Sequence, residues 1–148
     1  MDEREYQQAR EQLNQCPCVF EKAVLSTRCS CVHFQRLNIA EREAAACQAP
    51  IAQARCTQLL HYFYQNARFA LKLSHLEHQL AHAKAMKLQC GGLTGLSAVL
   101  QFPPSHHPSQ VKNIDALITQ ALTAFNKLEQ LPYQEIIKFI NHYQVRSK

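Results

Sequence analysis

Residues 16–31 read CPCVFEKAVLSTRCSC and hold two Cys-x-Cys pairs, one at each end. Two single cysteines follow at Cys47 and Cys56, and a seventh, Cys90, stands directly before a Gly-Gly pair. Thiolate is a soft ligand that suits zinc, copper(I) and iron–sulfur clusters. Four thiolates form the usual closed site for zinc or for a cluster. The density of cysteine therefore predicts a metal or iron–sulfur site in this part of the chain.

All seven thiols are candidate ligands: Cys16, Cys18, Cys29, Cys31, Cys47, Cys56 and Cys90. His33, two residues after Cys31, is a further candidate for a mixed site. The Cys-x-Cys pairs carry the prediction, because neighbouring thiols have no advantage in core packing. Cys56 lies on the apolar face of a predicted helix and Cys47 follows three alanines, so either could instead be a small packed side chain.

The spacing does not identify the metal. Zinc knuckles have two to four residues between their cysteines, whereas each pair here has one. The usual ferredoxin runs are also absent from the sequence. We favour an iron–sulfur cluster of the [4Fe–4S] type over zinc, because the surplus of thiols and a helical setting suit a cluster, and a helical pattern excludes a strand-rich zinc ribbon.

Helical periodicity dominates the rest of the chain. The most regular stripe has apolar residues at i, i+3, i+4 and i+7, and its members are Ile114, Leu117, Ile118, Ala121, Leu122, Phe125 and Leu128. The same reasoning predicts further helices over residues 2–15, 19–28, 39–48, 51–72, 75–90 and 132–143. Residues 29–37 show no clear period and are predicted to be a loop.

Caps support these assignments. Asp2, Asn38 and Asn113 are typical N-cap residues, and Gly91-Gly92 is predicted to end a helix. We therefore expect an all-α fold, a small bundle of four to six helices with a cysteine-lined site at one end. It would be a single domain spanning 1–148, with a cysteine-rich part (16–56) and a regular helical part (113–145).

Composition restricts the partners and the compartment. The net charge of +5 is spread without a dense Lys/Arg stripe, which argues against nucleic acid. There is no apolar run of roughly 20 residues for a membrane span, and the polar start lacks the apolar core of a signal peptide. A cytoplasmic protein is expected, where disulfides are uncommon. The odd number of 7 cysteines also opposes a closed disulfide framework.

The sequence favours a binding protein over an enzyme. It contains no Gly-rich phosphate loop, HExxH or Gly-x-Ser-x-Gly motif. Cys90 would lie at a helix C-terminus, where the dipole raises the pKa of a thiol and makes it a poor nucleophile. Our hypothesis is an iron–sulfur protein that acts with a protein partner in electron transfer, redox sensing or cluster handling. A zinc-stabilised protein-interaction module is the alternative, and a cysteine-dependent enzyme is the third reading; oligomeric state is left open.

Overall fold

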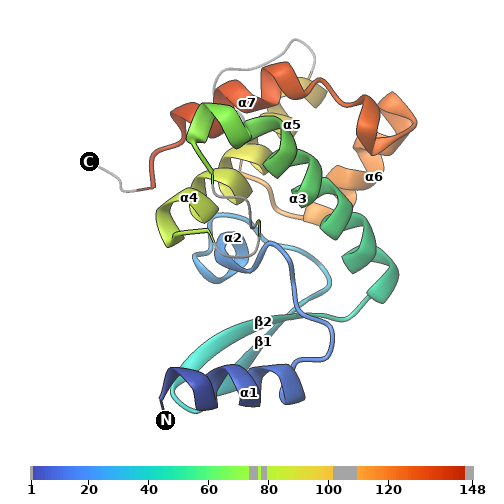
Figure 1. The fold of residues 1–148 in the computed structure, drawn as a ribbon. Helices are drawn as coiled ribbons and strands as arrows, with labels where there is room; N and C mark the ends of the chain where they lie inside the picture. Colours follow the sequence, from blue (N-terminus) through green and yellow to red (C-terminus); the bar gives the residue numbers. More distant parts are fainter. Residues whose placement is uncertain (1, 74–76, 78–79, 102–109, 146–148) are drawn as a thin grey trace.

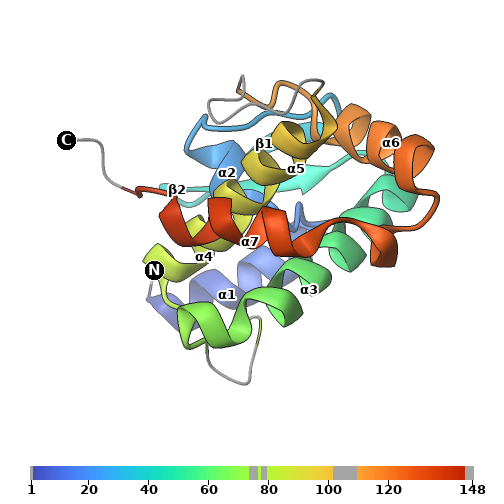
Figure 2. The ribbon, with the colours of Figure 1, turned by 90° about the horizontal axis from the view of Figure 1, so that it is seen from above.

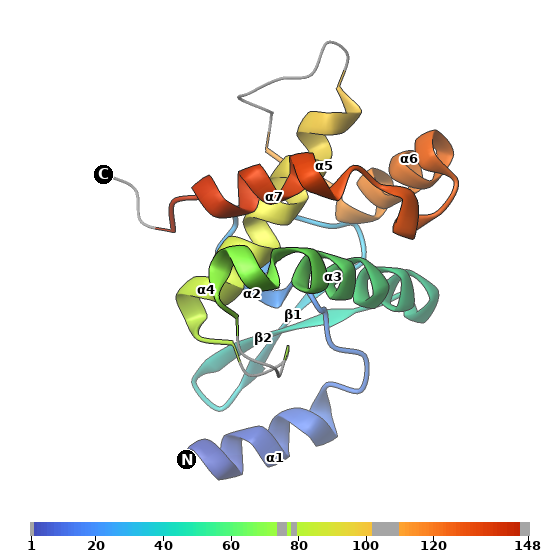
Figure 3. The same ribbon diagram turned by 45° about the horizontal axis from the view of Figure 1, so that its top comes forward.

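The computed structural model describes residues 2–73, 77, 80–101 and 110–145. Helix α1 and a β-hairpin lie at one end of the molecule, and α5, α6 and α7 lie at the other (Figures 1 and 3). In chain order the elements are α1 (Glu3–Leu13), α2 (Glu21–Leu25), β1 (Phe34–Ile39), β2 (Arg42–Cys47), α3 (Pro50–Leu71), α4 (His82–Met86), the π-helical turn η2 (Lys87–Gly91), α5 (Gly92–Leu100), α6 (Ile114–Phe125), the 3₁₀ turn η3 (Leu128–Gln130) and α7 (Tyr133–His142).

The all-α prediction is wrong, because a two-stranded antiparallel sheet accompanies the helices. The helix predicted over residues 39–48 is instead the end of β1 followed by β2, and the loop predicted over residues 29–37 contains the start of β1. Ala40, in the turn between the strands, has a left-handed φ of 57°. The pairing runs from Phe34 opposite Cys47 to Ile39 opposite Arg42. The protein is therefore mostly helical but of mixed class.

Three consecutive buried alanines explain why β2 resembles a helix in the sequence. Alanine has the highest helix propensity, but Ala44, Ala45 and Ala46 form a strand that is covered on both sides. Ala44 packs in a small cluster with Tyr6 of α1, whereas Ala45 belongs to the main core. Tertiary packing against two opposite layers thus overrides local propensity here.

The first helix is confirmed with its predicted cap. The Glu5 backbone N–H donates to the Asp2 carboxylate at 2.8 Å, and the Asp2 N–H donates to the Glu5 carboxylate at 3.2 Å. This reciprocal capping box satisfies two of the free donors at the helix start. Only Tyr6 of α1 is buried, so the helix is held to the hairpin by a narrow contact.

The helix stop predicted at Gly91-Gly92 is wrong. The chain stays helical from α4 through η2 into α5, and both glycines have right-handed helical angles. These glycines serve packing: a Cβ on Gly91 would lie 2.7 Å from the Cα of Ile140, and one on Gly92 would lie 2.4 Å from the ring of Phe63. Figure 2 shows α7 crossing α5 closely. Part of the predicted 75–90 helix, residues 75, 76, 78 and 79, lies outside the described residues.

The main core lies between α3, α5, α6 and α7. The predicted stripe on α6 is confirmed for Ile114, Leu117, Ile118 and Ala121, which are buried. The helix ends at Asn126, which has a positive φ of 68°, so Leu128 reaches the core from η3 instead. Pro50 opens α3 as its first residue. None of the described helices combines the length and apolar character needed to cross a bilayer.

The close approach of α7 predicts the effect of filling one glycine. In an open helix Gly→Ala stabilises by about 1 kcal/mol, but Gly91→Ala should destabilise by about 1–3 kcal/mol because its methyl group meets the backbone of α7. Urea unfolding measures the difference. Ser97→Ala, partly exposed on α5, is the control and should change stability by less than about 0.5 kcal/mol. A stabilised Gly91→Ala protein would contradict this packing.

Candidate metal centre

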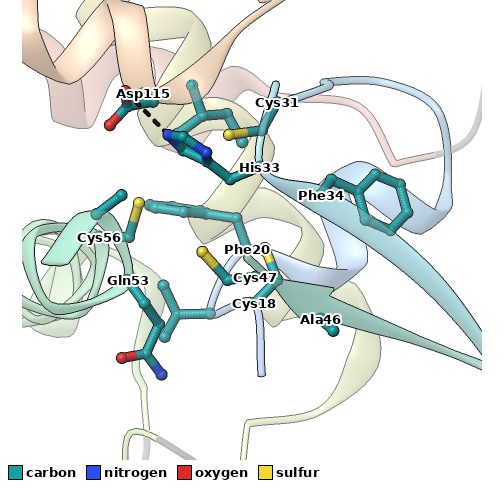
Figure 4. A pocket seen from close by; sticks show the side chains of 13 residues that line it. Cys18, Phe20, Cys31, His33, Phe34, Ala46, Cys47, Gln53, Cys56 and Asp115 are labelled. Atoms are coloured by element: carbon teal, nitrogen blue, oxygen red, sulfur yellow. Dashed lines mark hydrogen bonds and ion pairs between the residues drawn. The ribbon is translucent and has the colours of Figure 1, made fainter. Parts of the chain in front are cut away.

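One pocket collects four thiols from four separate segments of the chain (Figure 4). Its cavity volume is about 20 Å³, enough for about one water-sized group. Phe20, Ala52 and Ile114 supply apolar parts of the wall. Figure 4 shows sulfur atoms on different sides of the same space. The four cysteines are Cys18, Cys31, Cys47 and Cys56.

Cys18 and Cys47 are brought together by an extension of the hairpin. The Cys18 N–H donates to the Ala45 carbonyl at 3.0 Å, and the Cys47 N–H donates to the Cys16 carbonyl at 2.7 Å. Pro17 therefore forms an antiparallel bridge with Ala46 along the edge of β2 that faces away from β1. Because side chains alternate along extended chains, Cys18 and Cys47 project to the same side of this ladder.

Hydrogen bonds to sulfur also hold these two thiols. The Ala49 N–H donates to the Cys47 sulfur at 3.5 Å, and the Phe20 backbone bonds to Cys18. Each donor lies two residues after its cysteine. Such bonds favour the thiolate over the thiol, and thiolate is the form that binds a metal.

Cys31 is positioned by the start of α6. The Ile114 N–H donates to the Ser30 carbonyl at 3.0 Å, and the Val32 N–H donates to the Asn113 side chain at 3.2 Å. Asn113, predicted as an N-cap, makes no side-chain cap bond and holds this loop instead. Cys56 comes from α3, one turn after Ala52 on the same face.

Burial and mutual electrostatics raise the pKa of Cys18, Cys47 and Cys56. Each of the six possible pairs among the four pocket thiols interacts electrostatically. Burial is the main cause that raises the pKa of Cys18 and of Cys56 to about 12, and the neighbouring thiols add to it. Burial likewise raises the pKa of Cys47. Without a bound cation, Cys18 and Cys56 are therefore neutral thiols at pH 7.

A carboxylate and an imidazole line the pocket, and an arginine outside the lining binds the carboxylate. Asp115 accepts from Arg55 at 2.7 Å, and a nitrogen of His33 lies 3.3 Å from the other Asp115 oxygen. Sequence reasoning found His33 but missed Arg55 and Asp115. No local signal links them, because they come from α3 and α6. Asp115 adds to the raised pKa of Cys56.

The remaining cysteines lie elsewhere. Cys16 is beside Cys47 and in hydrogen-bonding contact with its thiol, but it does not line the pocket. Cys29 and Cys90 form a separate buried pair, 2% and 1% exposed. Contact of Cys90 with Cys29, and also with Tyr143 and Arg28, lowers the pKa of Cys90 to about 7. The predicted direction was upward, from the dipole of a helix C-terminus, but the helix continues through η2 into α5 and these contacts lower the pKa instead.

The structure thus divides each Cys-x-Cys pair. The second cysteine of each pair lines the pocket with Cys47 and Cys56, whereas the first lies outside it. Within the described residues, no group of three or more His, Cys, Asp or Glu side chains has the arrangement to hold a metal ion as it stands. Comparison with models of known families, with curated proteins and with solved structures gives no significant match.

The raised pKa values predict that the metal-free protein loses stability in alkaline solution. In the unfolded chain a thiol ionises near pH 8.5, whereas Cys18 and Cys56 keep their protons to about pH 12 in the fold. Between these pH values the folded state binds more protons, so the free energy of unfolding falls as the pH rises. Each thiol contributes a slope of up to about 1.4 kcal/mol per pH unit.

Urea unfolding of wild type and Cys56→Ser at several pH values between about 8 and 11 checks this. The free energy of unfolding should fall less steeply with pH in Cys56→Ser, because the variant lacks one of the thiol protons that the wild-type fold retains. Thr57→Ala, an exposed neighbour on α3, should keep the wild-type slope. Parallel slopes for wild type and Cys56→Ser would show that the thiol of Cys56 is not held protonated.

Proposed function

We propose that the protein binds an iron–sulfur cluster, with [4Fe–4S] favoured, through Cys18, Cys31, Cys47 and Cys56. The observation that supports this most is the convergence of four thiols on one pocket, each from a different segment. Random core packing has no reason to bring four thiols to one pocket. Four thiolates are also the complete ligand set of such a cluster.

The electrostatics of the pocket favour a cation or a cationic core there. Four thiolates in a half-buried pocket repel one another, and burial is the main cause that keeps Cys18 and Cys56 in the neutral form. A bound metal reverses this balance, because a coordinated thiol loses its proton outright. The N–H donors at Cys18 and Cys47 then stabilise the remaining negative charge.

Zinc is the second candidate, because the same four thiols would complete a tetrahedral structural site. Sulfurs that face one space from different walls fit either group. The space of about 20 Å³ is that of one water-sized group, so a single ion fits it as it stands, whereas a cluster requires the walls to move apart. The preference for a cluster rests on the surplus of thiols in the sequence.

Two exposed apolar side chains near the pocket support the proposal of a protein partner. Val32 is 64% exposed and Ile51 is 82% exposed. Val32 directly follows the pocket residue Cys31, and Ile51 lies four residues after Cys47. Apolar side chains of this size on a surface are typical of contact with another protein. Electron transfer, redox sensing and cluster handling all require such contact.

We place the protein in the cytoplasm, where free thiols persist, and propose no substrate turnover. Cys90 has the lowered pKa of a nucleophile, but its burial denies a substrate access.

Anaerobic reconstitution with iron and sulfide tests the proposal. Wild type should gain a broad absorbance near 400 nm, and Ser at any of the four pocket positions should lower iron content at least several-fold, since a hydroxyl is a harder ligand. The matched controls Cys29→Ser and Cys90→Ser should retain the absorbance, because these thiols lie outside the pocket. Colourless protein that binds one zinc through the same four residues would instead favour the zinc site.

Metal removal should destabilise the cysteine-rich part of the chain more than α6 and α7. Residues 16–56 contribute the four ligands, whereas α6 and α7 are held by apolar packing. Because binding free energy is then folding free energy for the cysteine-rich part, hydrogen exchange after chelation should accelerate in 16–56 and stay slow in 114–142. Equal acceleration along the chain, or none, would contradict a site built into the fold.

A further inference from the structure

Cys16 is a fifth thiol that the four-thiol pocket does not use. It lies on the segment that extends the hairpin, and its carbonyl accepts the N–H of Cys47 at 2.7 Å. The bridge between Pro17 and Ala46 places Cys16 directly opposite Cys47 in this antiparallel ladder. Their side chains therefore share one side of the ladder, and the two thiols are in hydrogen-bonding contact.

This placement suits a covalent bond. Residues that face each other across antiparallel strands have Cα atoms about 4.5–5.5 Å apart. Disulfides span Cα separations of about 4.4–6.8 Å. Both cysteines are also partly exposed, in contrast to the buried Cys29 and Cys90. A small oxidant can therefore reach Cys16 without unfolding the protein.

We propose that Cys16 and Cys47 are a thiol-modification site that closes to a disulfide when the protein meets a low-molecular-weight disulfide such as oxidised glutathione. The Cys16 thiolate attacks one sulfur of the oxidant, forms a mixed disulfide and releases one reduced glutathione. The Cys47 thiolate then attacks the Cys16 sulfur, forms the Cys16–Cys47 bond and releases the second glutathione. Two thiols are oxidised and one disulfide is reduced, so electrons and protons balance.

The bond would change the pocket. Cys47 is one of the four thiols that line it, so closing the disulfide leaves Cys18, Cys31 and Cys56. Three thiols cannot supply the complete set of four that a cluster takes from cysteine. Cys16 would thus make the site sensitive to oxidation. Formation of the disulfide does not depend on the metal, whereas its effect on a cluster rests on the proposed function.

Disulfide mapping of the full-length, metal-free protein tests the bond itself. After treatment with oxidised glutathione, alkylation of free thiols and trypsin, we expect residues 11–22 joined to residues 43–55, which contain only Cys47. The first peptide holds both Cys16 and Cys18, so two variants identify the partner. The joined peptide should disappear in Cys16→Ser and persist in Cys18→Ser.

An unfolded sample provides the control for chance pairing. The yield of the joined peptide should fall several-fold in urea, because the ladder that aligns the two thiols is lost. Absence of the peptide in the folded protein, its survival in Cys16→Ser, or an equal yield in urea would each overturn the proposal.

A second measurement tests whether the Cys16–Cys47 disulfide affects a bound cluster. In protein loaded with iron and sulfide, oxidised glutathione should bleach the absorbance near 400 nm several-fold more slowly in Cys16→Ser than in wild type. Equal rates would show that the disulfide does not control the cluster. A chain that never gains the absorbance would contradict the proposed function, and the peptide assay would still decide the disulfide.

Discussion

The structure depends most on the two backbone hydrogen bonds that join residues 16–18 to the free edge of β2. They connect the chain before α2 to the hairpin that follows it. Without them, Cys18 would have no fixed place relative to Cys47. They also cover the buried alanines of β2 on the edge that β1 leaves open. The same contact thus completes the small sheet and assembles half of the candidate metal centre.

The other half of the candidate metal centre, Cys31 and Cys56, is positioned by the helical core. The loop that carries Cys31 is hydrogen-bonded to the start of α6, and Cys56 belongs to α3, whose apolar face enters the main core. The pocket therefore lies at a junction between the hairpin and the helices. A group bound there would hold the two parts together, which is the role of structural metal sites in small proteins.

The amino-acid sequence predicted the helices whose signal is local. Asp2 and Glu5 form a cap within four residues, and the stripe on α6 needs only its own period. The hairpin was not predictable in this way, because Ala44–Ala46 favour a helix until two layers of the fold enclose them. Gly91 likewise has the usual features of a helix stop, but the close approach of α7 decides its role.

The candidate site was likewise predictable only where its signal is local to the sequence. The cysteine density indicated soft-metal chemistry, and all the pocket thiols were among the predicted ligands. Which thiols meet depends on strand pairing and on the loop at α6, neither of which has a local signal. The division of each Cys-x-Cys pair follows from this. Cys16 and Cys18 lie on the same side of the ladder, but Cys16 is opposite Cys47 whereas Cys18 is opposite Ala45 and lines the pocket. The buried contact with Cys90 keeps Cys29 outside the pocket.

X-ray absorption at the iron edge of reconstituted protein tests the central claim most directly. A cluster held by Cys18, Cys31, Cys47 and Cys56 predicts iron surrounded by sulfur alone, with further iron atoms in the next shell. Iron bound mainly by nitrogen or oxygen, or iron with no iron neighbour, would contradict a cluster held by these four thiols.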